Sequence, residues 1–160
     1  MANKSISDFF KKKKEAVASV QKEIASNAME QLYESSPHML DQDSPYATGQ
    51  YESNHKVSVN DEEFSALHPS LISEFDFQSY KDIQKDPSFF QEIITEQRLQ
   101  PEKDRLEKVK CGDSVTITNP TPHAYAVETG DDPQWHYNDG YHPYSNTKEV
   151  LKGRYKNVLK

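Results

Sequence analysis

The chain has 160 residues, a net charge of −7 and only 34% apolar residues, against a usual apolar share of about 45–50%. Its single cysteine, Cys111, excludes an internal disulfide. Residues 41–107 hold fifteen acidic and six basic groups, which disfavours general nucleic-acid binding. We expect no signal peptide, because the N-terminal residues include no apolar run long enough for one. No run approaches the roughly 20 apolar residues that span a bilayer. We therefore expect a soluble protein of a reducing, intracellular compartment.

The first predicted element is a long helix that ends at about Glu34. Ser5 or Ser7 can cap its start, and Pro37 ends it, because the residue before a proline resists the helical conformation. Its apolar residues recur at three- and four-residue spacing and form one stripe: Val17, Val20, Ile24, Ala28 and Leu32. Residues 11–14 are four lysines near the start of this helix. We expect them to face solvent, and contact with phosphate or with an anionic partner is the alternative.

The middle of the chain predicts one strand and several short helices. Residues 56–59 alternate as a strand does, and Asn60 and Asp61 form a turn after it. In the acidic segment 62–110, we expect short helices around residues 63–67, 79–85 and 87–98. Pro101 is expected to stop the last of these, and charged residues 102–110 are typical of a linker or an exposed helix.

The C-terminal third predicts a strand, a short helix, a loop and a final helix. Residues 114–118 are rich in β-branched side chains, which favours a strand. A short helix follows from Pro122, with Gly130 just past its end, and Tyr125 and Val127 are expected to dock on the sheet. Residues 131–144 form an aromatic loop. Ser145 or Asn146 can cap the last helix, 147–160, whose apolar side is formed by Val150, Leu151, Tyr155, Val158 and Leu159.

Catalytic and metal chemistry has little support in the sequence. His123, His136 and His142 lie near several carboxylates, which are ligands that zinc takes, but no HxxxH or HExxH spacing places two ligands on one helical face. No nucleophile motif and no phosphate-binding loop is present. We therefore assign no catalytic, cofactor-binding or metal-binding residue and expect no enzyme, with a metal-dependent hydrolase using the histidine loop as the least favoured alternative.

Two groups of residues, far apart in the chain, carry the strongest pattern. Residues 46–54 read YATGQYESN, in which a turn at Gly49 leads into the first strand; residues 121–130 read TPHAYAVETG and follow the second strand. Together they resemble the minor tail proteins of long-tailed bacteriophages, also called tail-completion or neck proteins. The matching residues are Thr48, Gly49, Tyr51 and Ser53 in the first group, and Tyr125, Ala126, Glu128 and Gly130 in the second.

The resemblance implies a fold and a function. The fold is a single α+β domain over residues 1–160, with a long N-terminal helix, a small antiparallel sheet with packed helices, and a C-terminal helix. The function is structural: a homo-oligomeric ring, commonly a hexamer, at the head–tail junction of the virion. Its partners are the tail tube or tail terminator protein and the head connector or adaptor proteins, with DNA only as passing cargo, no membrane, and assembly in the host cytoplasm.

Three surfaces are candidate contacts in such a ring. The aromatic loop offers Trp135, Tyr137, Tyr141 and Tyr144, residue types favoured as interface anchors. The acidic middle and the basic last helix can pair between neighbours, and an acidic ring bore would let DNA slide past. The segment 62–110 departs from the family pattern and is expected to be an inserted arm. A monomeric phage or host adaptor protein is the alternative function.

Overall fold

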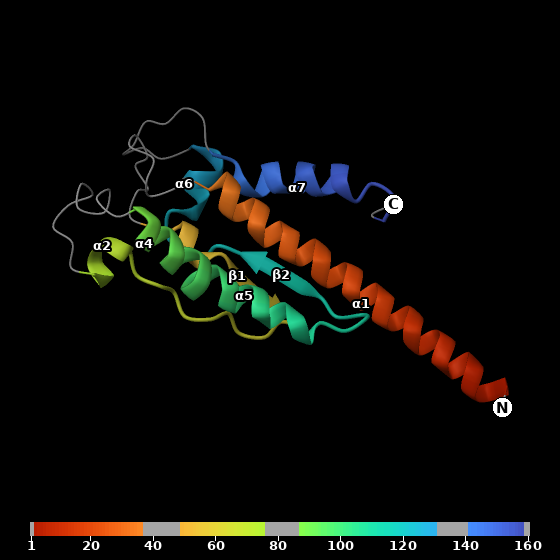
Figure 1. Cartoon of the computed structure of the whole chain (residues 1–160). Helices are drawn as coiled ribbons and strands as arrows, with labels where there is room; N and C mark the ends of the chain where they lie inside the picture. The colour runs from red at the N-terminus through yellow and green to blue at the C-terminus, as the bar shows by residue number, and fades with distance from the viewer. Residues whose placement is uncertain (1, 37–48, 76–86, 131–140, 159–160) are drawn as a thin grey trace.

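The computed structural model describes residues 2–36, 49–75, 87–130 and 141–158. Two strands, β1 (Lys56–Val59) and β2 (Val115–Thr118), form an antiparallel sheet. The described helical elements are α1 (Ala2–Ser35), η1 (Glu52–Asn54), α2 (Leu71–Glu74), α4 (Pro87–Glu92), η2 (Ile93–Leu99), α5 (Gln100–Asp104), η3 (Arg105–Lys108), α6 (Ala124–Thr129) and α7 (Pro143–Arg154). The fold is therefore α+β, with a long first helix and a C-terminal helix, which confirms the predicted class (Figure 1).

Helix α1 contributes only its C-terminal half to the core. It begins at Ala2, before the serines predicted to cap it, and it ends two residues before Pro37. Its buried apolar residues are Ala25, Ala28, Met29, Leu32 and Tyr33. Val17 and Val20 of the predicted stripe are instead 52% and 36% exposed. The N-terminal half of the helix extends beyond the other elements (Figure 1), so nothing described packs on that part of the stripe.

The sheet is buried on both faces along β1. Its register pairs Lys56 with Thr118 and Val59 with Val115, and all four residues of β1 are buried, including the lysine. Asn60 follows with a positive φ of 53°, its backbone N–H donates to the Ser114 carbonyl at 3.0 Å, and its side-chain amide donates to Asp113 Oδ1 at 2.8 Å. The predicted turn after β1 is therefore tied directly to the start of β2.

A continuous helical stretch occupies residues 87–108, and Pro101 does not stop it as predicted. The turns before the proline are widened into a π-helix, η2, in which Gln100 N–H bonds to the carbonyl of Thr95. Pro101 then lies in the first turn of α5. At that position its missing N–H and fixed φ are tolerated, so the chain continues as a helix through it.

The described part of the acidic segment belongs to the core rather than to a projecting arm or a linker. Phe90, Ile93 and Ile94 pack with Tyr33 of α1 and with Leu71. Leu106 and Val109 complete a second cluster with apolar residues of α1 and β1: Ala25, Met29, Val57 and Val59. The predicted helix at 63–67 is wrong, because residues 62–70 lie in no regular element. The helix predicted at 79–85 lies outside the described residues.

Helix α7 packs against α1, and α6 contacts α7. Helix α6 ends as predicted, with Gly130 in the left-handed conformation. Helix α7 starts at Pro143 rather than at Thr147, and it lies along the C-terminal half of α1 (Figure 1). Tyr155 joins the two helices, because its hydroxyl donates to Glu23 at 2.9 Å and accepts from Asn27. On the predicted apolar side of the last helix, Val150 and Val158 are 39% and 55% exposed.

Candidate functional site

The two sequence groups that carry the family resemblance meet in one buried junction. Tyr51 has no exposed surface, and it packs against Ala126 and Val127 of α6. The carbonyl oxygen of Tyr51 accepts a hydrogen bond from the Asn119 side chain at 2.8 Å. We call Tyr51, Asn119, Ala126 and Val127 the junction. It joins the segment before β1 to the segment after β2, which are far apart in the sequence but are held together by the sheet.

Two glycines shape the chain on either side of the junction. Gly49 has a φ of 71° and Gly130 a φ of 74°, values that residues with a side chain adopt only with strain. Gly49 opens the turn into η1, where Ser53 is buried and its N–H donates to the Gly49 carbonyl at 3.2 Å. The N–H of Gly130 donates to the Ala126 carbonyl at 2.8 Å, which ends α6. Thr48 lies outside the described residues.

Glu128 fixes the start of α7. Its carboxylate accepts hydrogen bonds from the backbone N–H groups of Tyr144 and Ser145, each at 3.0 Å, and from the Ser145 hydroxyl at 2.6 Å. The first N–H groups of a helix have no partner within the helix, and a negative charge at that end is favourable. Glu128, rather than the predicted Ser145 or Asn146, therefore caps the last helix, from a position on α6.

His55 links three elements beside the junction. It is 2% exposed, and its Nε2 lies 2.8 Å from Ser36 Oγ at the end of α1. Its Nδ1 lies 3.3 Å from the hydroxyl of Tyr144 on α7, and its ring meets that of Tyr51 edge-on, with centroids 5.2 Å apart. The imidazole thus connects the end of α1, the start of β1 and the start of α7.

The hydrogen bonds around His55 assign its tautomer. The Ser36 hydroxyl donates to the Leu32 carbonyl at 2.6 Å, so toward the imidazole it acts as an acceptor. Nε2 of His55 therefore carries the proton, and Nδ1 accepts from the Tyr144 hydroxyl. Burial lowers the pKa of His55 to about 3 and raises the pKa of the phenol of Tyr144. Both groups are accordingly neutral at pH 7.

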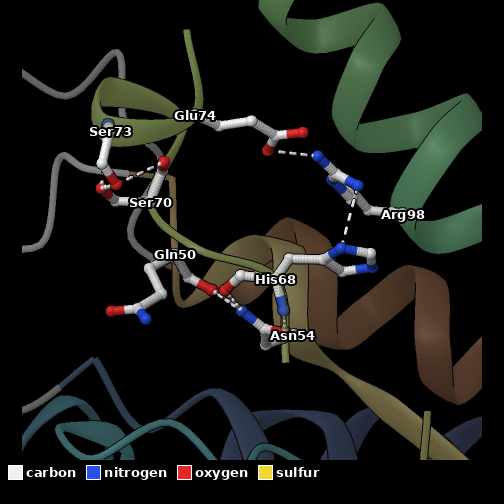
Figure 2. Close-up of polar contacts among 7 residues, drawn as sticks. All are labelled: Gln50, Asn54, His68, Ser70, Ser73, Glu74 and Arg98. Carbon is white, nitrogen blue, oxygen red and sulfur yellow. Dashed lines mark hydrogen bonds and ion pairs between the residues drawn. The ribbon is translucent and has the colours of Figure 1, made fainter. Parts of the chain in front are cut away.

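A polar cluster, shown in Figure 2, holds the irregular segment 62–70 against η1 and α2. Asn54 has no exposed surface and binds the backbone of His68 on both sides. Its Oδ1 accepts from His68 N–H at 2.8 Å, and its Nδ2 donates to the His68 carbonyl at 3.0 Å and to the Gln50 carbonyl at 2.7 Å. This pairing substitutes for the regular secondary structure that the segment lacks.

Arg98 extends this cluster from the helical stretch. It is 8% exposed, forms an ion pair with Glu74 of α2, and donates from Nη1 to His68 Nδ1 at 2.9 Å. The histidine therefore accepts at Nδ1, and its pKa is lowered by burial and by the charges of Lys56 and Arg98. Arg98 anchors α2 and residue 68 to η2 (Figure 2).

A second buried ion pair joins β1 to α5. Lys56 Nζ lies 3.7 Å from Glu102 Oε1, with side chains 0% and 4% exposed. Glu102 also accepts from Val57 N–H at 2.8 Å and from the Ser65 hydroxyl. Burial lowers the pKa of Lys56, against the opposing effect of the Glu102 charge. The carboxylate thus ties the sheet, the irregular segment and the helical stretch together.

The described histidines do not gather around a metal-binding centre. His123 lies by Tyr51, with ring centroids 6.2 Å apart, whereas His142 is exposed at the start of α7 with a φ of 51°. His136 lies outside the described residues. Within the described part of the chain, no three His, Cys, Asp or Glu residues form a group that could hold a metal ion.

The surface residues selected from the sequence fall into different environments. Tyr125 is 67% exposed, so the prediction that it docks on the sheet is wrong, whereas Val127 is fully buried. Tyr141 packs against the junction and donates its N–H to the Val127 carbonyl at 2.9 Å. Tyr144 is half-buried and bonds to His55, as described above. Trp135 and Tyr137, the other two candidate anchors, lie outside the described residues.

Sequence reasoning missed the buried polar residues His55, Asn54 and Glu102. Their partners lie far along the chain, 89 residues away for His55 and Tyr144, 14 for Asn54 and His68, and 45 for Glu102 and Val57. No local spacing marks such pairs. The one local sign of a buried polar residue is its position inside or beside a predicted strand, as for His55 and Lys56 at the start of strand 56–59.

Comparison with known proteins identifies no relative of this chain. No family model matches the chain, no match was found among curated proteins, and no solved structure matches it. Among the described residues, no helix is both long and apolar enough to cross a membrane.

Proposed function

We propose that this chain is a structural subunit of a bacteriophage neck, acting only through protein–protein association. It would form a ring with copies of itself at the head–tail junction. It would contact the tail tube or tail terminator protein on one side and the head connector or adaptor proteins on the other. Such a ring requires that one patch on each copy bind a different patch on the next.

The observation that carries the proposal is the junction. The resemblance rests on two short groups of residues, and each alone is weak. Tyr51 of the first group packs directly on Ala126 of the second, Gly49 and Gly130 take the left-handed conformation, and Glu128 caps the helix that follows. A pattern whose members serve one structural unit is less easily matched by chance than two unrelated segments, and this supports the assignment.

Exposed apolar surface also supports an association function. Among the described residues, the N-terminal half of α1 carries five exposed large apolar side chains. They include Phe9 and Phe10, at 56% and 58% exposure. Exposed apolar groups that gather on projecting elements are typical of contact surfaces. The buried polar residues, by contrast, join elements of the chain to one another.

The experiment is to determine the state of assembly of the purified full-length chain. We expect ring-shaped particles in negatively stained electron micrographs. Light scattering should give a mass of about 110 kDa for six copies of an 18.4 kDa chain. A monomer at every accessible protein concentration and ionic strength would contradict the proposal and favour a monomeric adaptor protein. If rings form, their bore is expected to be acidic, so that DNA slides past without adhering. A basic or neutral bore would contradict this expectation.

A further inference from the structure

The projecting half of α1, residues 5–20, presents side chains that the rest of the described chain does not cover (Figure 1). Every one of these residues is exposed except Ala18, which is partly buried. Its large apolar side chains are Ile6, Phe9, Phe10, Val17 and Val20. At 100° per residue they fall within an arc of about 100°. This is the width of a stripe that normally faces a protein core.

The same segment carries unpaired positive charge. Residues 11–14 are four lysines, and none of them forms an ion pair with any described residue. The Lys13 ammonium lies 5.5 Å from the centre of the Phe9 ring, so charge and apolar surface are intermixed. The partner of this segment should therefore be acidic and should also offer apolar surface.

The distribution of the lysines argues against two occupants of this surface. Four consecutive residues point to all sides of a helix, whereas helices that lie on anionic lipid keep the basic residues on one face and the apolar residues on the other. Pairing with the same segment of a second copy would bring lysines against lysines, which is unfavourable.

An acidic and apolar face of suitable chemistry lies on α4 and η2. Glu92 and Glu96 are exposed, four residues apart on the helical stretch, and form no ion pair with a described residue. Phe89, three residues before Glu92, is 44% exposed. Other glutamates of the chain, such as Glu30 and Glu62, are paired with lysines. We call Phe89, Glu92 and Glu96 the acidic face.

The projecting half of α1 cannot reach the acidic face of its own chain. The helical stretch runs antiparallel to α1, because Gln91 bonds to Tyr33 whereas Glu107 pairs with Lys22. The acidic face therefore lies beside the C-terminal end of α1. Lys13 lies 20 residues before Tyr33, about 30 Å away at 1.5 Å per residue. The two complementary surfaces are thus at opposite ends of one rigid helix.

We propose that the projecting half of α1 docks on the acidic face of a second copy of this chain. The contact is head-to-tail: the projecting half of α1 is the donor surface of each copy, and the acidic face is its acceptor surface. Repeating this contact closes a ring if the rotation between neighbouring copies allows it. The inference rests on the proposed function, because it names the contact through which that self-assembly occurs. Charge pairing fixes the register, while the phenylalanines supply apolar contact.

The test uses charge reversal on each surface of the full-length chain. Lys12→Glu with Lys13→Glu changes the donor, and Glu92→Lys with Glu96→Lys changes the acceptor. All four side chains are exposed, so both variants should fold, which circular dichroism checks. We expect each variant alone to assemble at least about tenfold more weakly than the wild type by sedimentation velocity. An equimolar mixture should recover assembly, because the two reversed surfaces are again complementary.

Two controls separate this contact from its rivals. Lys148→Glu with Lys156→Glu, called the α7 variant, reverses the same number of charges, one on α7 and one just after it. It should leave assembly within about twofold of the wild type. Phe9→Ser with Phe10→Ser should weaken assembly without changing its salt dependence. The contact is overturned if the α7 variant disassembles while the α1 variant does not, or if the mixture fails to recover.

The remaining outcomes distinguish this inference from the proposed function. If the wild type forms rings and the α1 and acidic-face variants form them equally well, the contact is wrong while the ring function stands. A monomeric wild type would overturn both. Co-sedimentation of the wild type with phosphatidylserine vesicles, lost in the Lys12→Glu/Lys13→Glu variant without an effect on assembly, would assign the segment to lipid and overturn the contact.

Discussion

Protonation of His55 should destabilise the fold as the pH falls. The imidazole is 2% exposed, it is neutral at pH 7, and its two nitrogens are engaged by Ser36 and Tyr144. Burial lowers its pKa to about 3, against about 6.5 in an unfolded chain. Between these two values the unfolded state binds the proton and the folded state does not. The stability that the neutral form provides is therefore complete above about pH 6.5 and is lost as the pH decreases toward 3.

The magnitude follows from the two pKa values. Between pH 7 and pH 5, the linkage relation gives a loss of about 2 kcal/mol in the free energy of unfolding from this one group. Below pH 3 the loss levels off at roughly 5 kcal/mol. For a chain of this size, about 2 kcal/mol lowers the midpoint of thermal unfolding by roughly 4–8 °C.

Urea denaturation of the wild type and of His55→Gln at pH 7 and pH 5 measures this effect. Glutamine offers a hydrogen-bond donor and an acceptor but does not titrate. The readout is therefore the change in the free energy of unfolding between the two pH values, not its value at one pH. We expect the wild type to lose about 2 kcal/mol more than the variant over this interval. Other titrating groups, including His68, are common to both proteins and cancel. Equal losses in the two proteins would refute a buried, neutral His55.

Three further predictions test the contacts around the junction and the aromatic loop. Glu128→Ala should cost about 1–2 kcal/mol in urea denaturation, because it removes the cap of α7; Glu128→Gln, which keeps an acceptor oxygen, should lose less, and an undiminished stability in the alanine variant would contradict the capping role. Glu102→Ala should cost about 3–5 kcal/mol by leaving Lys56 buried without a counter-charge, and adding Lys56→Met should restore part of the loss; no recovery in the double variant would argue against an uncompensated charge. Trp135→Ala with Tyr137→Ala should weaken oligomerisation while the monomer stays folded by circular dichroism, and an unchanged oligomer mass by light scattering would exclude the loop as an anchor.

The polar residues inside this fold explain how a chain with few apolar residues forms a defined core. Three apolar clusters are each small, and the segments between them are connected by buried hydrogen bonds of Asn54, Glu102 and His55. Buried polar groups are costly unless they are paired. His55 connects the end of α1 to α7, and Glu102 connects the helical stretch to β1. Asn54 holds the irregular segment 62–70 against η1.

Local sequence signals predicted the elements whose determinants are local. The first helix, both strands, the turn at Asn60 and the end of α6 at Gly130 were confirmed, since periodicity, β-branched residues and glycine act over a few positions. The stop at Pro101 was wrong, because the sequence does not show the π-helix that precedes the proline. The short helix at 63–67 was wrong, because side chains of Asn54 and Glu102 hold that segment in an irregular conformation.

The sequence by itself determined the α+β fold class and the type and order of the main elements. It also contained the two groups of residues that resemble the phage neck family. Only the tertiary structure decided that these groups meet at Tyr51 and Ala126, that Glu128 caps α7 and that His55 is buried and neutral. It also decided which part of the predicted α1 stripe is buried, since Ala28 and Leu32 are buried whereas Val17 and Val20 are exposed. The physical reason is range: propensity and periodicity act between neighbours, whereas burial and partner choice depend on residues that the fold brings from far along the chain.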